Sequence, residues 1–100
     1  MLLVDGTLTL NPDRMEEAVP SITALVHASR AEIGCIDFVF SEEVGSPGTI
    51  RVFERWESRQ HLDHHQATSH VAQWRKAAAE LDIVRRSLVV YDHMGEPSEL

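Results

Sequence analysis

The sequence predicts an α+β domain with a ferredoxin-like split βαβ fold, in which helices cover one face of an antiparallel sheet. Segments with strand and helix patterning follow one another in the order βα-ββ-αβ, which is typical of that arrangement. Apolar side chains also occur on both faces of the expected strands. Since a sheet that is apolar on both faces must be covered on both, we expect a second copy of the chain on the face without helices, as in a two-fold homodimer.

The first strand and first helix are expected in the N-terminal third of the chain. Apolar and polar residues alternate over Leu2–Leu10, which indicates a strand. Asn11-Pro12 then favours a helix start, with an N-cap and a proline at the first helical position. Apolar residues recur at helical spacing over Met15–Ser29. Pro20 lies inside this stripe and predicts a kink or a restart, and Gly34 is expected to end the helix.

A β-hairpin is expected in the middle of the chain. Cys35–Ser41 is rich in β-branched and aromatic residues, and residues 42–48 form a turn-like Gly/Pro segment. Thr49–Trp56 is then the third strand. Strict alternation is not evident in this strand, although Glu54 and Trp56 share one face of it.

Two short helices and a final strand complete the predicted domain. Ser58 is expected to cap the first of these helices, and Thr68 or Ser69 the second. The second carries Val71, Trp74, Ala78 and Leu81 at helical spacing. Apolar residues in the segment 83–93 indicate the last strand. We therefore expect one domain over residues 1–94 and a polar tail over residues 95–100.

Composition and charge exclude several classes of protein. The 100 residues are 43% hydrophobic and 25% charged, which fits one ordinary globular domain. The formal net charge of −7 argues against nucleic-acid binding and against adhesion to anionic membranes. No apolar run approaches the roughly 20 residues of a membrane helix, and the N-terminus lacks signal-peptide patterning. The single cysteine, Cys35, fits a reducing cytoplasm, and we expect it to be a buried packing residue.

The segment between Phe53 and Trp74 is unusually rich in histidine, with His61, His64, His65 and His70. His61 and His64 are most simply solvated. A zinc set of three histidines is conceivable, because His61 and His65 are spaced i,i+4 and His70 follows. We expect no metal, because the H-E-x-x-H pattern is missing and the cysteine lies on another element.

Acid–base chemistry in an apolar pocket is the third interpretation of this segment. His65 shares the side of Leu62 and should face inward, and His70 opens the next helix, whose positive end would keep the imidazole neutral. If the face of the third strand that carries Glu54 looks toward the helices, this carboxylate could orient a histidine. Trp74 lies one turn beyond His70 and would wall the same space, although core packing is the simpler role for a tryptophan.

Three groups of residues together resemble a known family. They are Arg30-Ala31-Glu32-Ile33-Gly34-Cys35 with Phe38, then Phe53-Glu54-Arg55-Trp56, and then His65-Gln66-Ala67-Thr68-Ser69-His70 with Trp74. In this combination, which extends over nearly the whole chain, the sequence resembles the antibiotic biosynthesis monooxygenase superfamily, and within it the quinol monooxygenase branch.

The resemblance implies a dimeric α+β barrel and a monooxygenase that uses molecular oxygen without metal, flavin or haem. The implied substrate is a small aromatic quinol, naphthol or anthrone, and the protein supplies a base, a dry pocket and groups that hold the ring. It implies His65 or His70 as the base, and Glu54 is the remaining candidate for that role. The implied ring contacts are Phe38, Phe40, Trp56 and Trp74. Arg51 or Arg55 could balance an anion, although an exposed ion pair is the commoner role of such residues.

The family resemblance leaves more than one reaction open. Relatives that degrade haem use an asparagine on the first strand, where this sequence has Thr7 and Thr9, so haem degradation is not expected. The alternative to oxidation is a non-oxidative member of the dimeric-barrel type. It would be an isomerase for a small phosphorylated ketone or a small-molecule-binding stress protein, and a cavity lined by several arginines would favour a phosphorylated ligand.

Overall fold

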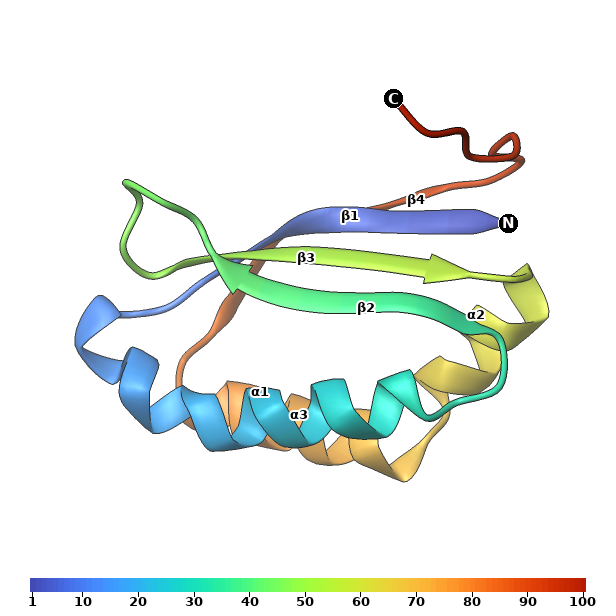
Figure 1. Ribbon diagram of the computed structural model, residues 1–100. Coiled ribbons are helices and arrows are strands. Elements are labelled where there is room, and N and C mark those ends of the chain that lie inside the picture. Colours follow the sequence, from blue (N-terminus) through green and yellow to red (C-terminus); the bar gives the residue numbers. More distant parts are fainter.

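The computed structural model describes all residues, 1–100, and has a single antiparallel sheet with every helix on one of its faces (Figure 1). The strands are β1 (Leu2–Thr9), β2 (Cys35–Glu42), β3 (Thr49–Trp56) and β4 (Val84–Tyr91). Their spatial order is β2-β3-β1-β4, so the first strand lies between the third and the fourth. This is the α+β ferredoxin-like fold that the sequence predicts.

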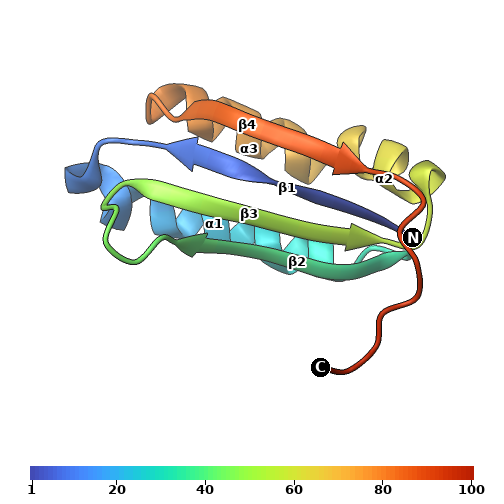
Figure 2. The ribbon, with the colours of Figure 1, turned by 90° about the horizontal axis from the view of Figure 1, so that it is seen from above.

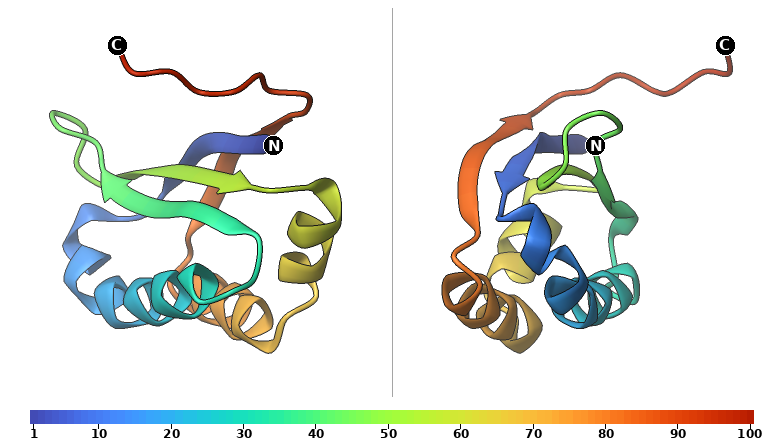
Figure 3. Two further views of the ribbon diagram at one scale, coloured as in Figure 1. Left: turned by 45° about the vertical axis from the view of Figure 1, so that its right-hand side comes forward. Right: turned by 90° about the vertical axis from the view of Figure 1, so that its left-hand side faces the viewer.

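Three helices form the second layer, with α1 and α3 beneath the sheet and α2 at one end (Figure 3). They are α1 (Met15–Arg30), α2 (Arg59–Gln66) and α3 (Ser69–Glu80), and the short 3₁₀ turn η1 (Pro12–Arg14) precedes α1. None of them has both the length and the apolar character needed to cross a membrane. Residues 92–100 contain no helix or strand and are exposed.

The start of α1 differs from the expected one. Asn11 does cap a helical turn, because its side chain accepts from the N–H of Asp13 at 3.0 Å, but this turn is the 3₁₀ turn η1. The α-helix proper begins at Met15 and continues through Pro20 without the expected restart. Pro20 is exposed and lies in the second turn, where its missing N–H removes a hydrogen bond to the preceding turn without ending the helix.

The N-caps of the two later helices confirm the predictions. The Ser58 hydroxyl accepts from the N–H of His61 at 3.3 Å, and the Thr68 hydroxyl accepts from the N–H of Val71 at 3.4 Å. Both cap residues are extended, which separates α2 from α3 by a tight break. This break places the end of one helix beside the start of the next, where His65 and His70 lie.

The sheet face that meets the helices forms the core. Strand β3 alternates regularly, contrary to expectation: Ile50, Val52, Glu54 and Trp56 are all buried on this face. Trp56 and Phe38 are almost completely buried, at 0% and 1% exposure. One polar residue, Glu54, therefore interrupts an otherwise apolar row at the centre of the sheet.

The opposite face of the sheet carries no helix (Figure 2). Its side chains are mixed, because ion pairs of Arg51 with Asp5 and of Arg55 with Asp37 lie among exposed apolar residues. The large apolar side chains exposed on this face include Val39, Phe53, Val89 and Tyr91.

Candidate active site

A cavity of about 460 Å³ lies between the sheet and the helices α2 and α3. Its size is that of a pocket for a small organic molecule. Of the 21 lining residues, 14 are hydrophobic, and the walls come from all four strands. The residues that could contact a ligand include Val4, Leu8, Phe38, Phe40, Val52, Leu62, Val71, Trp74, Leu88 and Val90.

Aromatic rings form one wall of the cavity. Phe38 stacks on Phe40 with ring centroids 5.5 Å apart, and Phe40 meets the indole of Trp74 edge to face at 5.6 Å. All three residues line the cavity, and their role as contacts of a substrate ring stays a prediction. Flat aromatic surfaces at such angles favour the binding of a planar ring.

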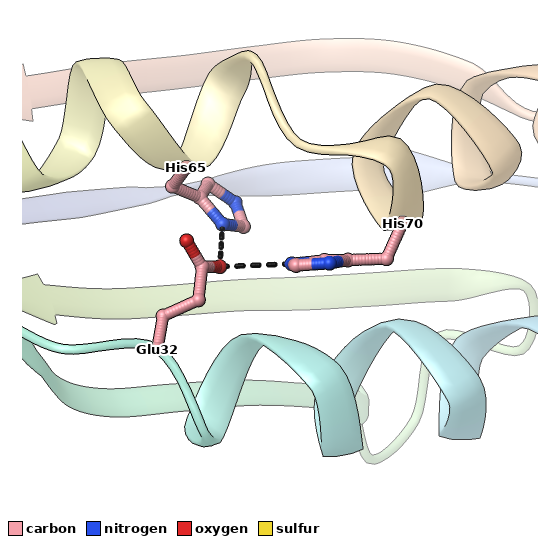
Figure 4. Close-up of side chains that lie close together, drawn as sticks. All are labelled: Glu32, His65 and His70. Atoms are coloured by element: carbon pink, nitrogen blue, oxygen red, sulfur yellow. Dashed lines mark hydrogen bonds and ion pairs between the residues drawn. The ribbon is translucent and has the colours of Figure 1, made fainter.

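A carboxylate joins the two histidines at the break between α2 and α3 (Figure 4). Oε2 of Glu32 lies 2.5 Å from Nδ1 of His65 and 2.9 Å from Nε2 of His70. Because a carboxylate oxygen accepts hydrogen bonds, both of these ring nitrogens act as donors. No role was predicted for Glu32, although it lies within one of the motifs that carry the family resemblance.

The turn between α1 and β2 brings Glu32 to the histidines, and Gly34 allows the close approach. Gly34 has φ +87°, and a Cβ atom there would lie 2.2 Å from the ring of His61. The ring of His61 also hydrogen-bonds through Nδ1 to the hydroxyl of Ser58 at 2.7 Å. His61 is therefore half-buried rather than solvated. The expectation that Gly34 ends α1 is also wrong, because the helix ends at Arg30.

His65 combines burial with access to the cavity. Its residue exposure is 3%, its ring lies 4.7 Å from that of Trp56, and it lines the cavity. Burial lowers the pKa of His65, and the hydrogen bond and charge of Glu32 only partly oppose this. The imidazole is consequently neutral near pH 7. Because Nδ1 carries the hydrogen, the lone pair of Nε2 is free, and no protein group donates a hydrogen bond to it.

His70 contributes to the same cluster from a different position. It is half-buried, and the residues that line the cavity do not include it. Its Nε2–H donates to the oxygen of Glu32 that also accepts from His65. The geometry therefore makes His70 a second donor that fixes Glu32.

Glu54 faces the cavity but does not contact a histidine, contrary to the expected orienting role. Its Oε1 accepts from the indole N–H of Trp56 at 2.9 Å. Burial raises the pKa of Glu54, opposed by this hydrogen bond and assisted by the charge of Glu32. Trp56 itself lies in the core and does not line the cavity, so it is not one of the ring contacts.

The arginine predicted to balance an anion lies elsewhere. Arg51 lies on the outer face of the sheet and pairs with Asp5 at 3.2 Å, because its position on β3 has the parity of Phe53 rather than of Glu54. Arg55 has the same parity and pairs with Asp37. The arginines that line the cavity are instead Arg59, Arg75 and Arg85. Their positions depend on tertiary packing, which their isolated places in the sequence do not indicate.

The donor atoms of Glu32, His65 and His70 lie within 4.8 Å of one another, so this cluster could hold a divalent cation in place of its hydrogen bonds. Oε1 of Glu32 is buried without a hydrogen-bond partner.

Cys35 is only partly buried, although a buried residue was expected. Burial still raises the pKa of its thiol to about 11, and its Sγ donates to the carbonyl of Asp37 at 3.7 Å.

Comparisons with known proteins agree with this architecture. The family model for the antibiotic biosynthesis monooxygenase family matches residues 1–77. The Bacillus subtilis protein "Putative monooxygenase YcnE" is 30% identical over 93 residues, covering 88% of this chain and 98% of that protein. Protein sll1783 of Synechocystis sp. is 29% identical over 80 residues, and the match spans 80% of this chain but only about half, 54%, of that protein.

A solved structure gives the same fold. The Deinococcus radiodurans protein described as a "putative antibiotic biosynthesis monooxygenase" superposes with a TM-score of 0.90 at 24% identity, covering 100% of this chain and 98% of that one. At this identity the likeness concerns the fold. The match of the family model over residues 1–77 and the 30% identity with the Bacillus subtilis protein lead to one conclusion: the chain belongs to the antibiotic biosynthesis monooxygenase family.

Proposed function

We propose that the protein is a monooxygenase that oxidises a small aromatic phenol or quinol with molecular oxygen and without a cofactor. The observation that carries this proposal is the hydrogen bond from Nδ1 of His65 to Glu32, which leaves a neutral imidazole in the wall of an aromatic cavity. Membership of a family that includes monooxygenases supports the reaction class.

The first step is removal of the phenolic proton by Nε2 of His65. The imidazolium that forms is stabilised by Glu32, which accepts from its Nδ1–H at 2.5 Å. The apolar walls exclude water and hold the ring, with Phe38, Phe40 and Trp74 as its contacts. A phenolate is more electron-rich than a phenol, so deprotonation prepares the ring for oxidation.

The electrons for the reaction come from the substrate. The phenolate passes one electron to oxygen, and the two radicals combine into a carbon-bound peroxide. Loss of the ring hydrogen as a proton and cleavage of the O–O bond leave a carbonyl on the ring. One oxygen atom stays in the product and the other leaves as water, so that a naphthol, C₁₀H₈O, and O₂ give a naphthoquinone, C₁₀H₆O₂, and H₂O. His65 returns its proton to the departing oxygen.

Oxygen uptake tests this proposal directly. The purified protein is supplied with a panel of naphthols, naphthoquinols and anthrones in the presence of a chelator, against a buffer control that measures spontaneous oxidation. We expect catalysed uptake that the chelator leaves unchanged. Uptake that depends on added metal or flavin would contradict the cofactor-free reaction.

A second candidate is a proton-transfer isomerase acting on a small phosphorylated ketone. The arginines Arg59, Arg75 and Arg85 in the cavity wall favour it, because guanidinium groups recognise phosphate. His65 as base and Glu54, whose pKa burial raises, as acid could then move a proton between neighbouring carbons. Anaerobic exchange of substrate protons for deuterium would distinguish isomerisation from oxidation.

We also propose that two copies of the chain associate through the open face of the sheet (Figure 2). The exposed apolar side chains of Val39, Phe53, Val89 and Tyr91 on this face support the proposal. Sedimentation at micromolar concentration should then give twice the chain mass of 11.3 kDa. A stable monomer would refute the association.

A further inference from the structure

We propose that the ligand of the cavity carries an anionic group, a carboxylate or a phosphate, which Arg75 and Arg85 bind at the rim. The inference rests on the proposed function only in that it takes the same cavity to be the substrate site. It adds a class of substrate: a planar apolar body with an acidic substituent.

The charge balance at the rim supports an anion. The three cavity arginines differ in their partners: Arg59 pairs with Asp63 at 3.4 Å and with Asp92 at 3.6 Å. Arg75, by contrast, donates only to the neutral amide oxygen of Gln66 at 2.7 Å, and Arg85 has no ion pair or side-chain hydrogen bond. In a chain of net charge −7, two arginines thus stay without an acidic partner at the edge of an apolar cavity.

An irregularity in the sheet directs Arg85 toward the cavity. The pairing of β1 with β4 is regular from Leu3↔Tyr91 to Thr7↔Ser87 and then shifts, so that Leu8 pairs with Arg85. Regular alternation from Leu88 would have brought Arg86 to the inner face. The bulge instead places Arg85 beside inward-facing Leu8, whereas Arg86 donates to Thr9 on the outer face at 3.0 Å. Bulges re-aim side chains in this way.

The sequence provides for this bulge at Gly6. A Cβ atom on Gly6 would lie 1.6 Å from the carbonyl oxygen of Ser87, a backbone atom that has no freedom to move aside. Only glycine therefore allows β4 to approach β1 closely just before the register shift. The glycine, the bulge and the inward Arg85 belong to one local arrangement.

The rim and the base lie on different walls. Arg75 is on α3 and Arg85 on β4, whereas His65 closes α2 beside the turn that carries Glu32. A ligand whose acidic group is held at the rim would have its apolar body among the aromatic side chains of the cavity. Charge-assisted hydrogen bonds from arginine then fix the direction in which the ring enters.

Calorimetric binding of matched ligands tests the inference without turnover. The probes are 6-hydroxy-2-naphthoate, its uncharged amide and 2-naphthyl phosphate, measured under anaerobic conditions. We expect the native protein to bind at least one anionic probe about tenfold or more tightly than the amide. The stronger of the two anions identifies the group as carboxylate or phosphate. Equal affinity for the amide and both anions, or no binding of any probe, would overturn the inference.

Three variants test whether Arg75 and Arg85 bind the anionic group. Arg75→Gln and Arg85→Gln should each reduce the preference for the anion several-fold, whereas Arg86→Gln, the neighbouring arginine on the outer face, should keep it. All three positions are exposed, so thermal unfolding should confirm that each variant folds. An undiminished preference in both cavity variants, or an equal loss in Arg86→Gln, would contradict the assignment. If anions are preferred but no probe or phenol consumes oxygen, the rim inference stands and the proposed oxidation fails.

Discussion

Glu32 and Glu54 are two carboxylates near one cavity, yet their surroundings give them different chemistry. The side chain of Glu32 is 8% exposed and accepts hydrogen bonds from His65 and His70. Glu54 is 6% exposed and accepts one hydrogen bond, from the indole of Trp56. An imidazole can take up a proton and an indole cannot, so Glu32 can stabilise a neighbouring imidazolium, whereas Glu54 would have to take up a proton itself. The partner of a buried carboxylate, more than its burial, therefore decides its role.

Removing the base should have the largest effect. His65→Ala is expected to lower kcat for oxygen uptake by about a hundredfold or more, the usual range for general acid–base catalysis. His65 is buried, so His65→Gln serves as a second variant that retains more of the packing. His64→Ala, which changes an exposed histidine on the same helix, is the matched control. Near-normal turnover in a folded His65 variant would transfer the role of base to another group.

Removing the second donor to Glu32 should have a smaller effect. His70→Ala deletes one of the two hydrogen bonds to Oε2 but leaves the contact with His65. We expect a loss of kcat of about tenfold, with little change in KM because His70 does not line the cavity. A loss as large as that of His65→Ala would instead make His70 the base.

Replacing Glu54 with glutamine should increase the stability of the folded protein. The pKa of Glu54 is raised in the folded protein, so this carboxyl binds a proton more tightly there than in the unfolded chain. Stability is then lost as the pH rises above the unfolded pKa of about 4.5 toward the folded pKa. Glu54→Gln removes this penalty and should stabilise the protein at pH 7 by on the order of 1 kcal/mol.

Thermal unfolding at pH 7 and pH 4.5 measures this effect. The difference between native protein and Glu54→Gln should shrink at the lower pH, where the native carboxyl is protonated. A variant that is less stable at both values would show that the ionised carboxylate is the stabilising form.

Cys35 should give the smallest effect. Its pKa of about 11 leaves almost no thiolate at pH 8, so labelling by iodoacetamide should be much slower than that of a free thiol. Cys35→Ala should keep full activity and cost about 1 kcal/mol of stability. Rapid labelling of the native protein with loss of turnover would contradict both expectations.

The fold was largely predictable because its signals are local. Alternation in β1 and the caps Ser58 and Thr68 involve residues close together in the chain, and the structure has them as expected. Pro20 was misleading because a proline early in a helix, on an exposed face, disturbs little. The two-sided apolar pattern predicts association, which stays a prediction.

The candidate site was only partly predictable because its contacts are long-range. His65 was recognised as inward-facing from its neighbour Leu62, and both are buried. Its partner Glu32 lies 33 residues earlier, and only the folded turn at Gly34 brings the two together. Arg51 has the parity opposite to Glu54 on β3 and so forms an ion pair on the outer face, and Arg85 was missed because a bulge in β4 changes which arginine faces inward.

The pH dependence of kcat/KM for oxygen uptake, compared between native protein and Glu32→Gln, tests the central claim most directly. Burial lowers the pKa of His65 while Glu32 raises it, so activity in the native protein should fall only below about pH 6.5, as the imidazole becomes protonated. Glu32→Gln should lower the plateau about tenfold or more and move this acidic limb to still lower pH. An acidic limb at the same pH in both proteins, or one that persists unchanged in His65→Gln, would contradict the assignment of His65 as a base held by Glu32.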